Sequence, residues 1–128
     1  MSFHQLLAED VSVNIALIVL TALLGLIGAF SAFGKYSGNA KTVEMLGGLG
    51  LDNRQIRLLG TIEIFGALGL LVGIWLPILG LLAAIGFVLY FLGAAIAHLR
   101  AKQSGKEMAP ALVLLVLSII VVLLQLTR

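Results

Sequence analysis

Residues 58–77, LLGTIEIFGALGLLVGIWLP, decide the fold of this chain. Glu63 is the one charged side chain in the stretch, which is long enough to cross a membrane, because about 20 helical residues span a hydrocarbon core of about 30 Å. Trp75 is of the aromatic type found at membrane interfaces, and Pro77 suits the first turn of a helix. The stretch therefore predicts a spanning helix, a tight turn and the start of a second spanning helix.

The composition of the whole chain extends this interpretation to both sides. Hydrophobic residues make up 61% of the 128 residues and charged residues 11%, whereas an ordinary soluble domain carries about 25% charge. Four segments are apolar enough to span, at about residues 15–33, 58–76, 78–97 and 109–126. Short connections make sequential helices antiparallel neighbours. We therefore expect residues 1–128 to form one all-α membrane domain, an up-and-down four-helix bundle.

Several other classes of protein are excluded by residue content. The first 14 residues contain no Lys or Arg, so we expect the first span to be retained and not cleaved as a signal peptide. The absence of cysteine excludes disulfides, thiolate metal sites and dithiol redox chemistry. The two histidines, His4 and His98, lie at opposite ends of the chain and do not predict a metal or haem site. We expect no intrinsic cofactor.

The distribution of basic residues predicts the orientation in the membrane. Seven of the eight Lys and Arg residues lie between spans one and two or between spans three and four: Lys35, Lys41, Arg54, Arg57, Arg100, Lys102 and Lys106. Arg128 alone lies on the other side. The positive-inside rule then places loops 34–57 and 98–108 in the cytoplasm and both termini outside. This position beside the spans explains the positive charge without nucleic acid as a partner.

Local signals mark the ends of the helices. Asp52 and Gln55 form a capping-box pattern before the second span, and residues 39–46, NAKTVEML, have the Asn start and the spacing of a short interfacial helix. Pro77 and Pro110 are expected at the starts of spans three and four, where a missing N–H costs nothing.

Glycines recur in the spans and predict close helix packing, which replaces the hydrophobic driving force in lipid. The set comprises Gly25 and Gly28 in span one, Gly60, Gly66, Gly69 and Gly73 in span two, and Gly86 and Gly93 in span three.

A lipid environment does not account for the charged side chain of Glu63 in the second span. It lies six residues into its span, about 9 Å along the helix axis from the basic side, and a charged carboxylate at that depth is costly unless it is paired or hydrated. Lys35, Tyr36 and His98 lie on the same side and are candidate partners, followed by Arg100. Three roles stay open for Glu63: a pair that sets helix register, a polar ligand site, and proton coupling for transport.

Two further side chains are candidates for the same site. His98 ends the third span, where it serves either as an interfacial anchor or in proton exchange. Tyr90 is in mid-span, and its hydroxyl requires a partner, so it either packs in the core or lines a cavity that it shares with Glu63.

Three motifs resemble the DoxX-like family of small four-span bacterial membrane proteins. They are FGKYSG after span one, LLGTIEIFGALGLLVG in span two and GAAIAHLRA at the end of span three, with the patterns E-x-x-G-x-x-G-L-L-x-G and A-x-x-H-x-R. The resemblance covers about residues 15–124. It assigns the family's basic position to Lys35, its intramembrane acid to Glu63 and its helix-end histidine to His98, and it implies a location in the bacterial plasma membrane.

The resemblance also implies a range of functions. The family takes its name from a subunit of a quinol-oxidising respiratory complex, other members are associated with membrane oxidoreductase assemblies, and distant relatives are chaperones for channel subunits. We therefore expect an accessory or anchoring subunit, not an enzyme on its own, with a quinone or lipid-headgroup pocket around Glu63. A protein partner or a homo-oligomer is expected beside the lipid bilayer. The alternatives are a small proton-coupled transporter that uses Glu63 and a membrane chaperone or scaffold.

Overall fold

The computed structural model describes the backbone of residues 2–127 and the side chains of residue 2 and residues 14–127. The side chain of His4 and all of Arg128 therefore lie outside the described part. Within it the chain forms five helices and no strand: α1 (Phe3–Ser37), α2 (Ala40–Gly47), α3 (Asn53–Val72), α4 (Pro77–Arg100) and α5 (Gly105–Thr127).

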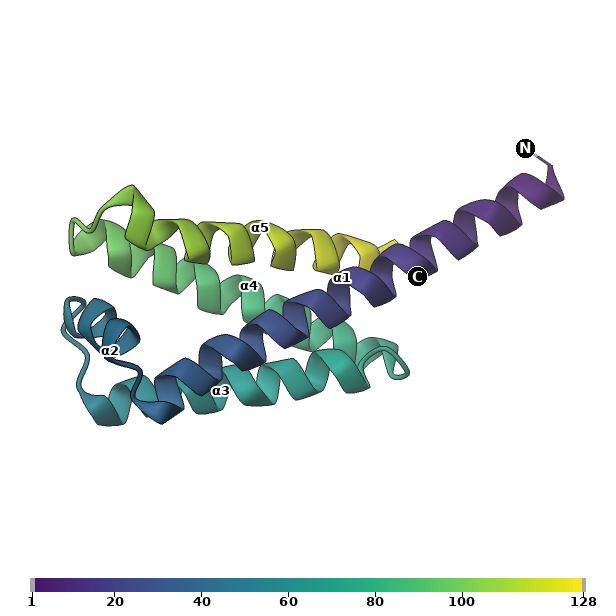
Figure 1. Cartoon of the computed structure of the whole chain (residues 1–128). Coiled ribbons are helices and arrows are strands. Elements are labelled where there is room, and N and C mark those ends of the chain that lie inside the picture. The colour runs from purple at the N-terminus through teal and green to yellow at the C-terminus, as the bar shows by residue number, and fades with distance from the viewer. Residues whose placement is uncertain (1, 128) are drawn as a thin grey trace.

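The four long helices form an up-and-down bundle, as the sequence predicts. Segments Asn14–Ser37, Asn53–Val72, Pro77–Arg100 and Gly105–Thr127 are each long and apolar enough to cross a membrane, and the chain is a multi-pass membrane protein. Each of α1 and α4 packs against both α3 and α5, so the four helices form a closed ring around one core (Figure 1).

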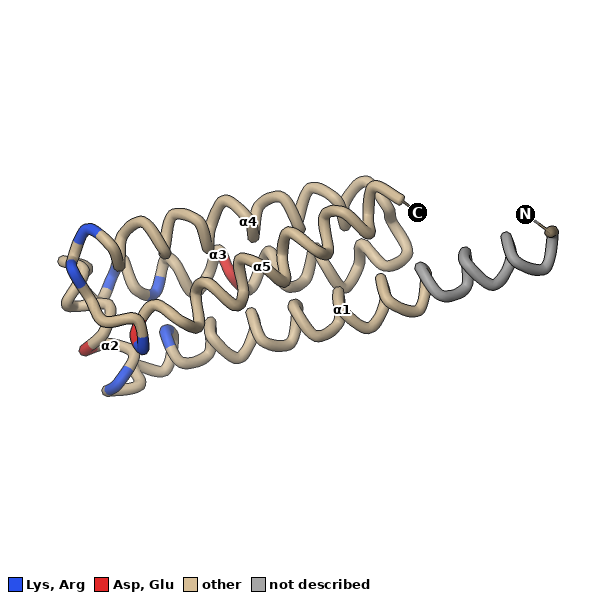
Figure 2. The backbone as a smooth tube through the Cα atoms, turned by 90° about the horizontal axis from the view of Figure 1, so that it is seen from above, with Lys and Arg blue, Asp and Glu red and all other residues tan. Residues whose placement is uncertain are grey.

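The two ends of the bundle differ in their connections. One end, here called the loop end, carries α2 and the connections α1–α3 and α4–α5, and the other, the turn end, carries the tight α3–α4 connection (Figure 1). Lys and Arg positions of the backbone gather at the loop end, whereas an acidic position of α3 lies nearer the middle of its helix (Figure 2). The charge pattern seen in the sequence is thus a property of one end of the fold.

Capping residues set most helix starts where the sequence places them. The Asp52 side chain accepts a hydrogen bond from Gln55 N at 2.8 Å, and Gln55 Oε1 accepts one from Asp52 N at 3.0 Å, which confirms the capping box. Asn39 caps α2 by accepting from Thr42 N. Pro77 stands in the first turn of α4, where its missing N–H costs no hydrogen bond.

Two predicted boundaries are wrong. The second span does not reach residue 76, because α3 ends at Val72 and residues 73–75 form a turn. Pro110 does not start the fourth span, because α5 begins five residues earlier at Gly105. The reason is Ser104, whose hydroxyl and carbonyl both accept from Glu107 N, while Glu107 Oε1 accepts from the Ser104 hydroxyl. The hydroxyl of Ser104 thus caps the start of the helix, and Pro110 is accommodated in its second turn.

The glycines divide into two groups. A Cβ atom added at Gly60, Gly66, Gly69 or Gly73 would lie 3.2 Å or less from an atom of the neighbouring helix, so these positions allow close approach, as predicted. Gly25 and Gly28 also face neighbouring side chains. The same prediction is wrong for Gly86 and Gly93, because a Cβ atom at either would have no neighbour within 4 Å. These two glycines border openings in the bundle.

Candidate functional site

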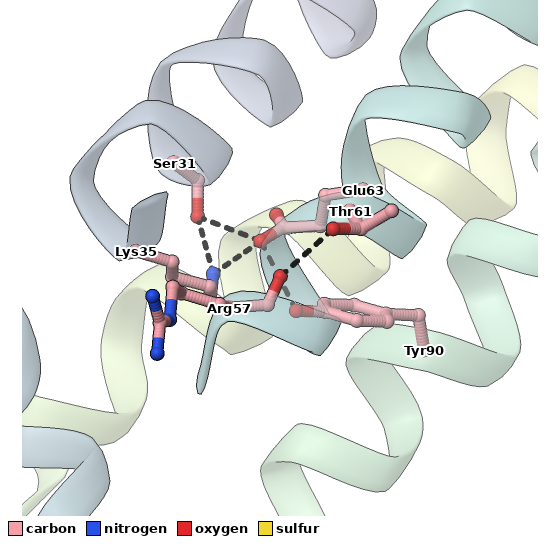
Figure 3. Close-up of polar contacts among 6 residues, drawn as sticks. All are labelled: Ser31, Lys35, Arg57, Thr61, Glu63 and Tyr90. Carbon is pink, nitrogen blue, oxygen red and sulfur yellow. Dashed lines mark hydrogen bonds and ion pairs between the residues drawn. The ribbon is translucent and has the colours of Figure 1, made fainter. Parts of the chain in front are cut away.

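A polar cluster surrounds Glu63 inside the bundle. The Oε1 atom of Glu63 accepts hydrogen bonds from Tyr90 OH at 3.0 Å and from Ser31 Oγ at 3.3 Å, and it forms an ion pair with Lys35 (Figure 3). Lys35 Nζ also donates to Ser31 Oγ at 2.8 Å. Glu63 is 1% exposed and Lys35 9% exposed. Three helices therefore meet at one carboxylate oxygen.

The sequence explains how these side chains come together. Ser31 and Lys35 are four residues apart on α1, so they lie on one face of that helix. Gly60 is one turn before Glu63 on α3, and a Cβ atom there would be 3.2 Å from both Ala32 O and Lys35 Cβ. Because Gly60 has no side chain, α1 approaches α3 closely enough for Lys35 to reach the carboxylate. The glycine that flanks the acid positions its partner.

Glu63 pairs with Lys35 and not with His98. Breaking such a buried pair by removing one partner leaves an uncompensated charge, which is strongly destabilising. The second oxygen, Glu63 Oε2, exposes less than 1 Å² and has no hydrogen-bond partner among the described residues. Oε1 of Glu63 thus accepts from three donors, whereas Oε2 accepts from none of the described residues.

A cavity of about 440 Å³ extends from this cluster toward the loop end, and we call it the loop-end cavity. Apolar side chains from α2, α3, α4, α5 and the α2–α3 connection make most of its wall, among them Leu46, Leu49, Leu59, Leu89, Phe91 and Leu114. Five polar residues also line it: Ser31, Lys35, Tyr90, His98 and Glu107. Small-molecule sites typically enclose about 300–1,000 Å³ and combine apolar walls with a few polar groups.

His98 lies at the other end of this cavity from Tyr90. The two residues are eight positions apart on α4, which is about 12 Å along the helix. His98 is 3% exposed, and its Nδ1 is hydrogen-bonded to Gln103 Oε1. Gln103 Nε2 in turn donates to Met45 O of α2 at 3.0 Å. His98 thus helps to fasten α2 over the cavity, and its Nε2 atom is the ring nitrogen that this hydrogen bond leaves for other contacts.

Tyr36 lies outside the Glu63 cluster. It is 53% exposed, and its hydroxyl lies 3.2 Å from Thr61 Oγ1. Together with Arg57 it borders another hollow, between α1, α2 and the start of α3, which Lys35 also lines. Of the five candidate residues, the structure places Lys35, Glu63, Tyr90 and His98 on or beside one cavity and Tyr36 elsewhere.

Sequence reasoning missed Ser31 and Gln103. Ser31 had a detectable signal, because it is the one hydroxyl residue a helical turn before Lys35 in an apolar span. Gln103 had no detectable signal, because its hydrogen bonds to His98 and Met45 O depend on where α2 lies in the folded chain. Among the described residues, no three His, Asp or Glu side chains are grouped as metal ligands. The groups that are brought together supply hydrogen-bond donors, one charge pair and an apolar wall.

Comparison with known proteins identifies the family. A sequence model described as the DoxX-like family matches residues 19–121. The matched range includes Lys35, Glu63, Tyr90 and His98, and it extends from α1 into α5. No curated protein and no solved structure matches the chain.

Proposed function

The chain belongs to the DoxX-like family, and we propose that it binds the head of a lipid-soluble molecule in the loop-end cavity as an accessory or anchoring subunit of a membrane oxidoreductase or envelope complex. The head is one that accepts hydrogen bonds, a quinone in the first place and a lipid headgroup in the second. The observation that carries the proposal is a cavity of about 440 Å³ with Lys35, Tyr90 and Ser31 at one end of an apolar wall.

The donors of the cavity support an acceptor ligand. An ammonium group has three N–H bonds, and Lys35 uses one on Ser31 and one on Glu63. The third remains for a carbonyl oxygen in the cavity that Lys35 lines. His98 Nδ1 donates to Gln103 Oε1, so the Nε2 atom of a neutral His98 is an acceptor and does not add a second donor. A ring with a carbonyl group fits between the Lys35 donor and the surrounding leucine side chains.

The charges of the cavity support a neutral head over an anionic one. The ammonium of Lys35 is paired with Glu63, so the cluster as a whole carries no net charge. Glu107 adds a carboxylate to the lining. A phosphate group would thus meet one negative side chain and no unpaired positive one, whereas a quinone carbonyl requires only the N–H donor of Lys35. We therefore rank quinone before lipid headgroup.

The shape of the molecule supports an accessory role. α2, at eight residues, is the one helix outside the four spans, and the connections between the described helices are short. A partner protein would supply the extramembrane part of a complex. The clustering of basic residues supports a cytoplasmic loop end, and membership of the DoxX-like family supports a bacterial plasma-membrane location. Because the chain has no cysteine, single cysteines placed at Lys106 and Trp75 would report the orientation by labelling from one side only.

Binding of decylubiquinone to the protein in lipid nanodiscs tests the proposal. We expect saturable binding that Gly93→Leu weakens at least tenfold, because Gly93 borders the cavity and has room for a side chain. Gly86→Leu is the matched control, since it places the same side chain seven residues earlier on α4, outside this cavity. Displacement of the quinone by anionic phospholipid would favour the headgroup. No saturable binding, or equal binding by both variants, would refute the cavity as the site.

Affinity purification in mild detergent tests the accessory role. We expect a second protein to copurify at a fixed ratio. A preparation that contains the chain alone would contradict the role of subunit and leave the ligand site to be judged by quinone binding.

A further inference from the structure

A second opening lies between α3 and α4, and we call it the lateral fissure. It encloses about 120 Å³ and is bordered by Glu63 and Gly66 of α3 and by Gly86, Phe87 and Tyr90 of α4. Tyr90 borders both the lateral fissure and the loop-end cavity. The two openings therefore meet the Glu63 cluster from different sides.

The lateral fissure borders the carboxylate whose second oxygen has no partner. Glu63 Oε1 already accepts from Ser31, Lys35 and Tyr90, whereas Oε2 exposes less than 1 Å² and accepts from none of the described residues. A buried acceptor without a hydrogen bond costs about 1–3 kcal/mol. Because Oε2 is covered, a donor in the fissure reaches it only when a neighbouring side chain moves aside, and the hydrogen bond would then recover this free energy.

Gly86 keeps the fissure open. Gly66 has a reason to be glycine, because a Cβ atom there would lie 3.0 Å from the Phe87 ring. Gly86 has no such reason, since a Cβ atom would meet nothing within 4 Å. Its neighbours Ile62 and Ile85 are exposed on the bundle surface, which in a membrane faces lipid. The opening is therefore accessible to a molecule dissolved in the bilayer.

We propose that the lateral fissure binds a phenol, with the hydroxyl donating to Glu63 Oε2 and the ring lying between Gly86 and Phe87. The volume suits a single ring, since an apolar cavity of about 150 Å³ is known to hold benzene, and any substituent would extend through the open side into lipid. The carboxylate would repel an anionic group, and its ion pair with Lys35 leaves no net charge to attract a cation, so a neutral donor is favoured. The ligand differs in kind from that of the loop-end cavity, where Lys35 offers an N–H donor.

The proposal does not rest on the proposed function. The lateral fissure has its own wall and offers an acceptor, and the two openings share only Tyr90 among their lining residues. The two sites are therefore separable by variants that fill one opening at a time.

A fluorine NMR titration tests the proposal, with 4-fluorophenol as the probe and the full chain in lipid nanodiscs. Empty nanodiscs correct for partition into lipid. We expect saturable binding of 4-fluorophenol and binding at least fivefold weaker for 4-fluoroanisole, which has the same ring but no hydroxyl donor. Gly86→Leu should weaken 4-fluorophenol binding at least fivefold, whereas Gly93→Leu should change it less than twofold.

The opposite results would overturn the proposal. Equal affinity for the phenol and the anisole would contradict the proposed hydrogen bond to Glu63. Retained affinity in Gly86→Leu would exclude the lateral fissure as the binding site. Should Gly86→Leu fail to fold, Ile62→Trp covers the same opening from α3 and must give the same loss. Phenol binding without quinone binding would refute the proposed function and leave this inference intact, and the reverse result would do the opposite.

Discussion

The loop end and the turn end of the bundle are built from the same two helices, yet α3 and α4 approach each other very differently there. At the turn end a Cβ atom on Gly73 would lie 2.2 Å from Gly80 Cα, so the two backbones are in contact. Farther along, Gly69 faces Ala83 at 3.1 Å and Gly66 faces the Phe87 ring at 3.0 Å. Toward the loop end the facing residues are Glu63 and Tyr90, and two openings appear beside them.

This difference shows that side-chain size sets helix separation in a bundle that lipid surrounds. Small residues permit the backbone contact at the turn end, while larger side chains hold the helices apart at the other. The polar side chains lie toward the loop end, where Lys35, Tyr90 and His98 line the loop-end cavity. One end thus holds the helices together and the other is suited to bind.

The largest expected effect comes from breaking the ion pair between Lys35 and Glu63. Lys35→Met leaves the carboxylate of Glu63, 1% exposed, without its counter-ion, and we expect a loss of about 3–5 kcal/mol in the free energy of unfolding. Glu63→Gln should cost less, because Lys35 lies near the helix end and its long side chain can reach the interface. Unfolding in detergent, followed by circular dichroism, measures both.

The double variant Lys35→Met, Glu63→Gln provides the control for this pair. It should be more stable than Lys35→Met alone, since no unpaired charge remains. Additive losses would mean that the two side chains act independently and that the pair does not organise the site.

A smaller loss is expected at the turn end. Gly73→Ala places a methyl group against the backbone of Gly80, and overpacking of this kind costs about 1–3 kcal/mol. Gly86→Ala is the matched control on α4, where the same methyl group meets nothing within 4 Å, and it should be neutral or stabilising by up to about 1 kcal/mol. Similar stabilities of the two variants in the same assay would contradict the contrast between the ends.

Removing one hydroxyl from the cluster should have a more modest effect. Tyr90→Phe deletes one of the three hydrogen bonds to Glu63 Oε1 and keeps the ring against Phe91, so we expect a loss of about 1.5 kcal/mol. Decylubiquinone affinity should fall together with stability, because Tyr90 lines the loop-end cavity. A stability loss with unchanged affinity would limit the Tyr90 hydroxyl to its structural hydrogen bond with Glu63.

The smallest expected effect is local. Gln103→Ala removes the link between His98 and Met45 O, and we expect a change in global stability of no more than about 1 kcal/mol. Hydrogen exchange of the α2 amides should nevertheless become faster, because this link joins α2 to the α4–α5 connection. Unchanged exchange in α2 would show that other contacts hold it over the cavity.

The sequence predicts the parts of this molecule that depend on local rules. The number of spans, the Asp52 cap, the Asn39 start and the Pro77 start follow from residue type and spacing, and the structure agrees with each. Glu63 is also detectable, because one acid in an apolar span has few explanations. The pairing with Lys35 was one of several open choices, since depth alone does not distinguish it from His98.

Other features depend on how the helices face each other and could not be predicted. Gly73 and Gly86 are indistinguishable as sequence, yet one is in backbone contact and the other borders an opening. The cap at Ser104 starts α5 before Pro110, whereas the proline in the sequence indicated a later start. The hydrogen bonds of Gln103 to His98 and to Met45 O depend on where α2 lies in the folded chain, which no local sequence pattern specifies.

A crystal structure of the protein grown from a lipid phase with decylubiquinone tests the central claim most directly. We predict density for the quinone ring in the loop-end cavity, with a carbonyl oxygen within hydrogen-bond distance of Lys35 Nζ and the tail directed along the apolar wall. A cavity closed by repacked side chains such as Leu46 and Leu114, with no quinone near Lys35, would contradict the account and leave the Lys35–Glu63 pair as a purely structural contact.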